Sequence, residues 1–339
     1  MPTANTPSTG QPISIDDIRI VFGLGNNLNT GDDLDDFHGI YYYDTFYPYA
    51  RGRFNTAAGS PLTLSDFYDK SAIDPAQPGF FYDDTAGVNK TYTLPVFRNS
   101  IQIAMWGAGG GGGSGFYKTD LSTSGSNGSN TLVSGTFSNN TNFTITAAGG
   151  ISGKSNTPSK DGAAGAGGST AITPSFASPN FTGTLTNGNA GSAGSTQRAI
   201  FKSGAGASAS SITVTSPYGL IVTYTGGTGG AAVSGNAVDI NGNKGSSLTG
   251  PGAGGSGGAW RYNTQSIGTR QIAGGGAGSG ATVFARISRL AITPGSILTY
   301  TVGAGGAGGV TTGFNPSGTE LAVGTGGNGS NGAILIIWS

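Results

Sequence analysis

The sequence lacks cysteine and is poor in histidine and in charged residues. Among 339 residues it has no cysteine, one histidine and 9% charged residues. A disulfide framework and a thiolate metal site are therefore excluded. No apolar run approaches the roughly 18 residues that cross a bilayer, and the first eight residues show neither the basic nor the apolar stretch of a signal peptide. We therefore expect no membrane insertion.

Groups that catalyse reactions are also scarce. Only four acidic residues follow residue 98, and they are widely spaced, whereas a glycosidase needs two carboxyl groups close together. The single histidine, His38, lies beside an acidic segment, residues 32–36 (DDLDD), so a Ser-His-Asp triad is not expected. We predict that the chain is not an enzyme and holds no cofactor or metal. A Ca²⁺ site in residues 32–36 is the alternative to a solvated loop, because several carboxylates follow one another there.

Charge divides unevenly along the chain. Twelve of the 16 acidic residues but only six of the 16 basic ones precede residue 99, so the net charge of zero is a cancellation. The ten basic residues that follow form no cluster. We therefore expect no nucleic-acid binding.

Glycine is the abundant residue, with 65 of 339 positions against a usual share of about 7%. Nine glycines precede residue 107, and the rest gather in runs separated by β-prone stretches such as residues 101–106 and 333–338. Several runs carry glycine at every third position, for example Gly303, Gly306 and Gly309. Three residues per turn is the period of the polyproline II helix, whose N–H and C=O groups point outward, and glycine lets such helices bond to one another. The glycine-dense segments are 107–115, 147–153, 162–168, 188–194, 226–230, 250–258, 274–280, 303–309 and 324–332.

The first 70 residues predict a small domain with short helices. Ser14 stands before residues 15–22 with two acids in the first turn, which is typical of a capped helix of about two turns. The pattern Pro, apolar, hydroxyl, apolar, any residue, Asp occurs at residues 12–17 and again at 61–66. Such a domain has a small core, so we expect it to dock on a partner.

Two further segments carry local signals. Residues 71–90 contain Pro75, Pro78 and Gly79 and predict a linker with a strand at 80–82. Pro-Gly within residues 293–296 lies between two β-prone runs and predicts a hairpin of 281–290 with 297–302.

These patterns resemble one known group of proteins. Residues 13–23 and 62–70, with the aromatic segment 41–53 between them, look like the short repeats of bacteriophage tail and baseplate proteins, which typically read ISLSDIR or SLSDFYGKS. Residues 101–115, 290–309 and 324–338 resemble, in order, three landmarks of the glycine-rich C-terminal domain of phage tail fibres and of T-even-like tip adhesins. The known fold of that family sandwiches polyglycine II helices.

The resemblance implies a mainly β chain in three parts. Residues 1–70 would form an N-terminal virion-docking domain with short helices, 71–90 a linker, and 91–339 a glycine-rich β and polyglycine II sandwich domain. It implies a virion tail protein that contacts other tail or baseplate proteins and a host surface protein or polysaccharide, as a homotrimer or as a monomer on a trimeric fibre. The main alternative is a structural tail component without host contact, and the third is an enzyme acting on surface polysaccharide.

The resemblance also implies the binding residues, because in that family the segments joining the glycine runs contact the receptor. Trp260 with Arg261 and Tyr262 is the best candidate, since aromatic residues and arginine dominate binding hot spots; the alternative is that Trp260 packs against the glycine runs. The candidate receptor-binding residues are Phe116, Tyr117, Lys118, Arg198, Phe201, Lys202, Trp260, Arg261 and Tyr262. The candidate virion-docking residues are Ile15, Ile18, Phe22, Tyr43, Tyr47, Leu64, Phe67 and Tyr68.

Overall fold

The chain is mainly β, with several antiparallel sheets and little helix. It divides into two compact units, a smaller one of residues 1–78, 95–99 and 339 and a larger one of residues 79–94 and 100–338. The structure is a computed structural model. It describes residues 5–22, 34–37, 40–44, 51–54, 61–71, 75–115, 123–155, 162–175, 179–197, 200–216, 220–235, 239–240, 242–245, 250–264, 268–310, 312–314, 320–322 and 324–339.

The smaller unit combines a helix with a short sheet around a core of aromatic rings. The sheet has the antiparallel order β2-β1-β3. Phe22, Phe37, Phe54 and Phe67 form the core, with ring centroids 4.3–6.3 Å apart. Its elements are α1 (Ile15–Phe22), η1 (Leu34–Phe37), β1 (Tyr41–Asp44), β2 (Arg51–Arg53), η2 (Leu64–Phe67) and β3 (Lys70–Ser71).

The repeated Pro-apolar-hydroxyl motif begins a helix each time. In the first copy the Asp17 carboxylate accepts from the Ser14 N–H at 2.8 Å, and the Ser14 hydroxyl accepts from the Asp17 N–H at 3.2 Å. In the second copy the Asp66 carboxylate accepts from the Thr63 N–H at 2.7 Å. These bonds satisfy N–H groups that a helix start leaves free. The predicted helix at residues 15–22 is confirmed as α1.

The larger unit contains two five-stranded antiparallel sheets. Sheet 1 has the order β10-β19-β6-β23-β4 and sheet 2 the order β5-β20-β7-β8-β9. Sheet 1 comprises β10 (Phe181–Thr186), β19 (Thr282–Ser288), β6 (Ser100–Trp106), β23 (Ala333–Trp338) and β4 (Gly79–Asp83). Sheet 2 comprises β5 (Gly87–Thr93), β20 (Ile297–Val302), β7 (Thr131–Thr136), β8 (Asn142–Ala147) and β9 (Thr170–Thr173).

Sheet 1 is covered on both faces. Its inner face packs on sheet 2, where Phe81 stacks on Tyr92 with ring centroids 4.4 Å apart. Its outer face carries the hairpin of β13 (Ile212–Thr215) and β14 (Ile221–Tyr224), whose Ile212 and Val214 are buried with Ala104, Trp106, Leu335 and Ile337. All seven residues of β6 are consequently buried.

Two local expectations are corrected by the strand pairing. The hairpin predicted for residues 281–302 is wrong: β19 and β20 form as strands, but β19 lies between β10 and β6 in sheet 1 while β20 lies between β5 and β7 in sheet 2. The Pro-Gly turn, with Gly295 at φ 80°, therefore passes the chain from one sheet to the other. The strand predicted at 80–82 is confirmed as β4, but residues 79–90 of the expected linker belong to the larger unit.

The glycine runs lie side by side and bond to one another through their backbones. Every third N–H of residues 107–115 donates to the same neighbouring segment, at N···O distances of 2.9–3.3 Å. The donors 107, 110 and 113 bond to 281, 278 and 275; 108, 111 and 114 bond to 129, 126 and 123; and 109, 112 and 115 bond to 330, 327 and 324. Residues 150–153, 255–258 and 306–309 donate in turn to carbonyl groups of the same run. Residues 107–115 thus have six bonded neighbours.

Two other segments, 250–258 and 274–281, are surrounded in the same way, and the three bond to each other. Within the described residues the bonded segments are 107–115, 123–130, 148–155, 162–169, 187–194, 203–211, 225–233, 242–245, 250–258, 274–281, 303–310 and 324–332. Residues 107–115, 251–258 and 274–281 are buried throughout, whereas outer segments expose every third residue, as at Ala304, Ala307 and Val310. We call the first three the inner segments.

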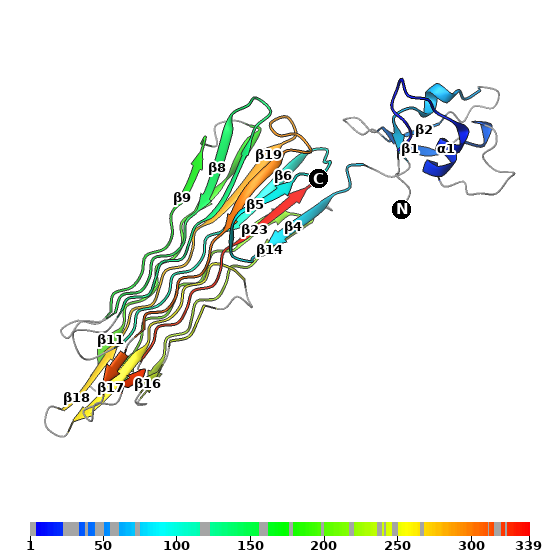
Figure 1. The fold of residues 1–339 in the computed structure, drawn as a ribbon. Coiled ribbons are helices and arrows are strands. Elements are labelled where there is room, and N and C mark those ends of the chain that lie inside the picture. The colour runs from blue at the N-terminus through cyan, green and yellow to red at the C-terminus, as the bar shows by residue number, and fades with distance from the viewer. Residues whose placement is uncertain are drawn as a thin grey trace. The chain divides into compact units, whose positions relative to one another are not determined.

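The remaining strands lie at the end of these segments opposite the two large sheets (Figure 1). They form two three-stranded sheets, ordered β11-β12-β15 and β16-β17-β18, and the pair β21-β22. We call this the connector end of the larger unit. Its strands are β11 (Ser195–Gln197), β12 (Ile200–Lys202), β15 (Ser234–Gly235), β16 (Asp239–Ile240), β17 (Ala259–Thr264), β18 (Gly268–Ala273), β21 (Thr312–Phe314) and β22 (Glu320–Ala322).

Candidate binding surfaces

The direction of the glycine segments decides which connections meet at the connector end. Ala108 and Gly111 donate to residues 129 and 126, so donor and acceptor numbers change in opposite directions and segments 107–115 and 123–130 are antiparallel. Successive segments therefore deliver their connections alternately to the two ends of the larger unit. One end receives the strands of the two large sheets, and the other receives β11, β12 and β15–β18 (Figure 1).

The best predicted binding segment lies at the connector end. Trp260, Arg261 and Tyr262 belong to β17, which follows Gly258 and pairs with β18 through Trp260↔Ile272, Arg261↔Gln271 and Tyr262↔Arg270. On its other edge β17 pairs with β16 through Trp260↔Asp239. This segment is therefore the middle strand of its sheet.

A second predicted segment lies next to it. Phe201 and Lys202 belong to β12, which pairs with β11 and β15. Both β11 and β12 lie beside β18, and Lys202 is exposed. The structure thus places residues 200–202 beside β18, the strand that pairs with residues 259–262.

The other receptor-binding candidates fall outside the described residues. These are Phe116, Tyr117, Lys118 and Arg198. The run that precedes residue 116 ends at Gly115, whose N–H donates to the Gly324 carbonyl at 3.0 Å.

The predicted docking residues of the smaller unit differ in exposure. Ile18 and Phe67 are fully buried, so they hold the unit together and leave contact with a partner to other residues. Leu64 is 41% exposed. Ile15, Phe22, Tyr43 and Tyr68 are half-buried, and Tyr47 lies outside the described residues.

An exposed aromatic and two arginines form a surface cluster that the sequence reasoning did not single out. Tyr41 is 50% exposed, and the guanidinium carbons of Arg51 and Arg53 lie 4.0 and 5.3 Å from its ring centroid. The register Tyr41↔Arg53 on β1 and β2 produces the cluster. The sequence pattern that could have predicted this cluster is the alternation of Arg51 and Arg53 after the tyrosine run, because alternate residues of a strand share a face.

A partly buried ion pair links the two large sheets. The Asp83 carboxylate of β4 accepts from the Lys90 ammonium at 2.7 Å and from the Tyr300 hydroxyl at 3.0 Å. Burial opposes ionisation, but the bonds from Lys90, the Thr85 N–H and Tyr300 outweigh it and lower the pKa of Asp83. Burial, with the Asp83 bond, raises the pKa of Tyr300 to about 12. These groups are partnered with each other, as befits a structural contact.

Metal and membrane sites were sought among the described residues. No three His, Cys, Asp or Glu side chains gather there as a metal site would need. Of the acidic segment only residues 34–37 are described, as η1, so the Ca²⁺ alternative stays untested. No helix in the described ranges has the length and apolar character to cross a membrane.

Comparison with known proteins adds no relative. Neither a scan against protein-family models nor a search of curated proteins gives a match for this chain.

Proposed function

We propose that this chain is a bacteriophage tail protein that docks through its smaller unit and recognises the host surface at the connector end. The glycine segments are proposed to be polyglycine II helices that form a rigid stalk ending in the connector strands. The position of β12 beside β18, the strand that pairs with the aromatic strand β17, carries the proposal, because both predicted binding segments then belong to one group of neighbouring strands.

Three observations support the polyglycine II assignment. Every third N–H of an inner segment reaches the same neighbour, as a helix of three residues per turn requires. Each inner segment bonds to six others, which is hexagonal packing. A methyl group added at Gly109, Gly111 or Gly112 would lie closer than 3.0 Å to the backbone of a neighbouring segment, so only glycine permits these approaches.

A stalk of this kind suits recognition because of what it leaves free. Its inner residues are fully committed to backbone contacts, while the strands at the connector end carry an arginine, a lysine and aromatic residues. Such side chains are typical of binding hot spots. The smaller unit, with its own core, is free to serve attachment to the virion.

The experiment is binding of the full chain to candidate host cells. We expect Trp260→Ala/Arg261→Ala/Tyr262→Ala to weaken binding at least tenfold with an unchanged melting temperature. The matched control is Leu220→Ala/Ile221→Ala/Ile297→Ala, which removes three exposed apolar side chains from the strands of the opposite end. This variant is expected to bind as the wild type does.

The alternative is a structural tail component that touches no host. It would be supported if the unmutated chain joins tail particles but binds no host cell. Breakdown of purified host polysaccharide by the full chain would instead favour the enzyme alternative.

A further inference from the structure

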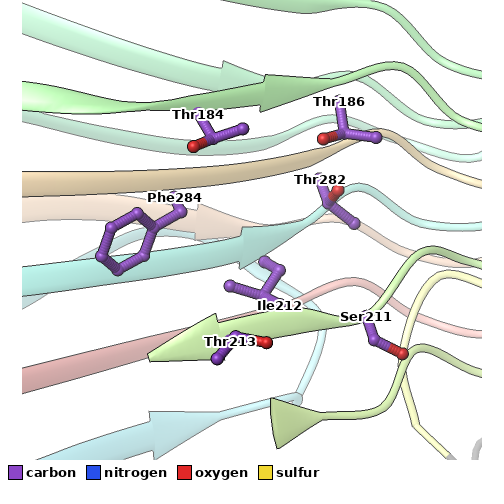
Figure 2. A pocket seen from close by; sticks show the side chains of 7 residues that line it. All are labelled: Thr184, Thr186, Ser211, Ile212, Thr213, Thr282 and Phe284. Atoms are coloured by element: carbon purple, nitrogen blue, oxygen red, sulfur yellow. The ribbon is translucent and has the colours of Figure 1, made fainter. Parts of the chain in front are cut away.

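The outer face of sheet 1 carries a pocket that host recognition at the connector end does not use. It has a volume of about 210 Å³ and is lined by Thr184, Thr186, Ser211, Ile212, Thr213, Thr282 and Phe284 (Figure 2). Its floor comes from β10 and β19, and its wall from the start of β13.

The pocket lies along the free edge of β13. The two strands that form its floor, β10 and β19, are paired within sheet 1. Among the described strands β13 pairs only with β14. No residue of β14 lines the pocket, so the pocket borders the edge of β13 that faces away from β14.

The hydrogen-bond alternation in this hairpin shows which backbone groups point to that edge. The Ser216 N–H donates to the Leu220 carbonyl at 2.6 Å, so the next pair, Thr215↔Ile221, is a non-hydrogen-bonded pair. Thr213↔Thr223 is the next such pair, and its two hydroxyls lie 3.0 Å apart. The N–H and C=O groups of Thr213 and Thr215 therefore face away from β14.

Thr215 already has an amide partner. The side-chain amide of Gln102, on β6, donates to the Thr215 carbonyl at 2.8 Å and accepts from the Thr215 N–H at 3.1 Å. These are the two bonds that a residue of an added strand would make. Thr213, two residues along the same edge, presents the same pair of groups to the pocket.

The floor suits a chain with small, uncharged side chains. Thr186 lies opposite Thr282, and Thr184 lies opposite Phe284. The pocket lining carries no charged residue. Thr282 is only 3% exposed yet lines the pocket, so a large residue cannot enter there without displacing it.

From this geometry we infer that β13 accepts an extended segment of a partner polypeptide as a third strand, laid over β10 and β19. The partner lies along the same edge of β13 as the Gln102 amide and exchanges backbone hydrogen bonds with Thr213. Its alternate side chains, which face the floor, are small and neutral, such as Ala, Ser, Thr or Val. In strand addition of this kind, main-chain hydrogen bonds provide the affinity and the contacts of alternate side chains provide the specificity. The inference is independent of the proposed host recognition.

The test uses the full chain and a displayed library of random nonapeptides. Thr184→Tyr fills the pocket from an exposed position of β10, and Thr182→Tyr, two residues earlier on the same face but outside the pocket, is its matched control. We expect enriched peptides with small residues at alternate positions that bind the wild type and T182Y equally and T184Y at least tenfold more weakly. If no peptide distinguishes T184Y from T182Y, the inference is overturned.

A second variant and a second readout separate strand addition from other binding. Thr213→Pro removes the N–H that faces the pocket and leaves the ladder to β14 intact, a position where an edge strand tolerates proline; it should also lose the peptide. Bound peptide should slow hydrogen exchange of the Thr213 N–H at least tenfold and leave that of Thr215 unchanged. Binding that survives T213P, or a glycan that binds the pocket in place of any peptide, would overturn the proposal.

Discussion

Replacing Gly112 with alanine tests the packing of the inner segments most directly. A Cβ at Gly112 would lie 1.9 Å from the Ser256 carbonyl oxygen, and clearing it to the 3.4 Å of ordinary contact moves one segment by about 1.5 Å. Four hydrogen bonds of 2.8–2.9 Å converge there, joining Gly112 to Gly327 and Gly309, and Ser256 to Gly327 and Asn243. A shift of that size breaks them, and each costs about 1 kcal/mol or more when buried groups lose their partners. We therefore expect a loss of about 4 kcal/mol.

The measurement is thermal unfolding of the larger unit, followed by the fluorescence of Trp106, which is buried and donates to the Ser210 carbonyl. A loss of about 4 kcal/mol corresponds to a fall of about 8–16 °C in a unit of this size. Ala307→Ser, which changes an exposed residue of an outer segment, is the matched control. It should cost less than about 1 kcal/mol. A Gly112→Ala protein that melts within 2 °C of the wild type would refute the packing argument.

Three further predictions concern other parts of the chain. Gln102→Leu should cost about 2 kcal/mol, because it leaves both backbone groups of Thr215 without partners, and should speed hydrogen exchange at Thr215; unchanged exchange would contradict it. Asp83→Asn should cost about 1–2 kcal/mol at pH 7; because the folded pKa of Asp83 is lowered, the gap to the wild type should close in denaturant titrations as pH falls below about 4. Phe67→Ala should lower the free energy of unfolding of the smaller unit by about 3–5 kcal/mol, whereas Leu64→Ala should lower it by under about 1 kcal/mol. Limited proteolysis of the full chain, monitored by cleavage within residues 1–78, would measure the difference.

Elements with their own local signal could be predicted from the sequence. The helix at 15–22 follows from Ser14 and the acids after it, and the strands at 101–106 and 333–338 follow from their apolar runs. Pairing could not be predicted, because it depends on distant segments. The Pro-Gly turn at residues 293–296 has the same local chemistry whether it closes a hairpin or crosses between sheets. Only the competing partners of β19 and β20 decide between the two.

The glycine segments show a second limit of the same kind. Nine were evident from composition, but 123–130, 203–211 and 242–245 were not, because they contain serine, alanine and asparagine between few glycines. In 123–130 the two glycines, Gly125 and Gly128, are the residues where a Cβ would collide with the backbone of 108–112. These two positions of an outer segment thus need glycine because they face an inner one.

This division between inner and outer positions also bears on the candidate site. The placement of β12 beside β18, the strand that pairs with residues 259–262, depends on the order in which the described glycine segments are packed, and no local pattern encodes that order. Once the packing order is fixed, the inner segments have almost no space for side chains. The outer segments have space for one at every third residue, and the connecting strands accept any side chain that their short sheets tolerate. Changes in surface chemistry are thereby confined to the outside and the ends, where they leave the backbone bonds of the interior intact. A chain built in this way can change its surface side chains without changing its fold, which is the physical reason for placing the proposed recognition site in the connections and not in the glycine runs.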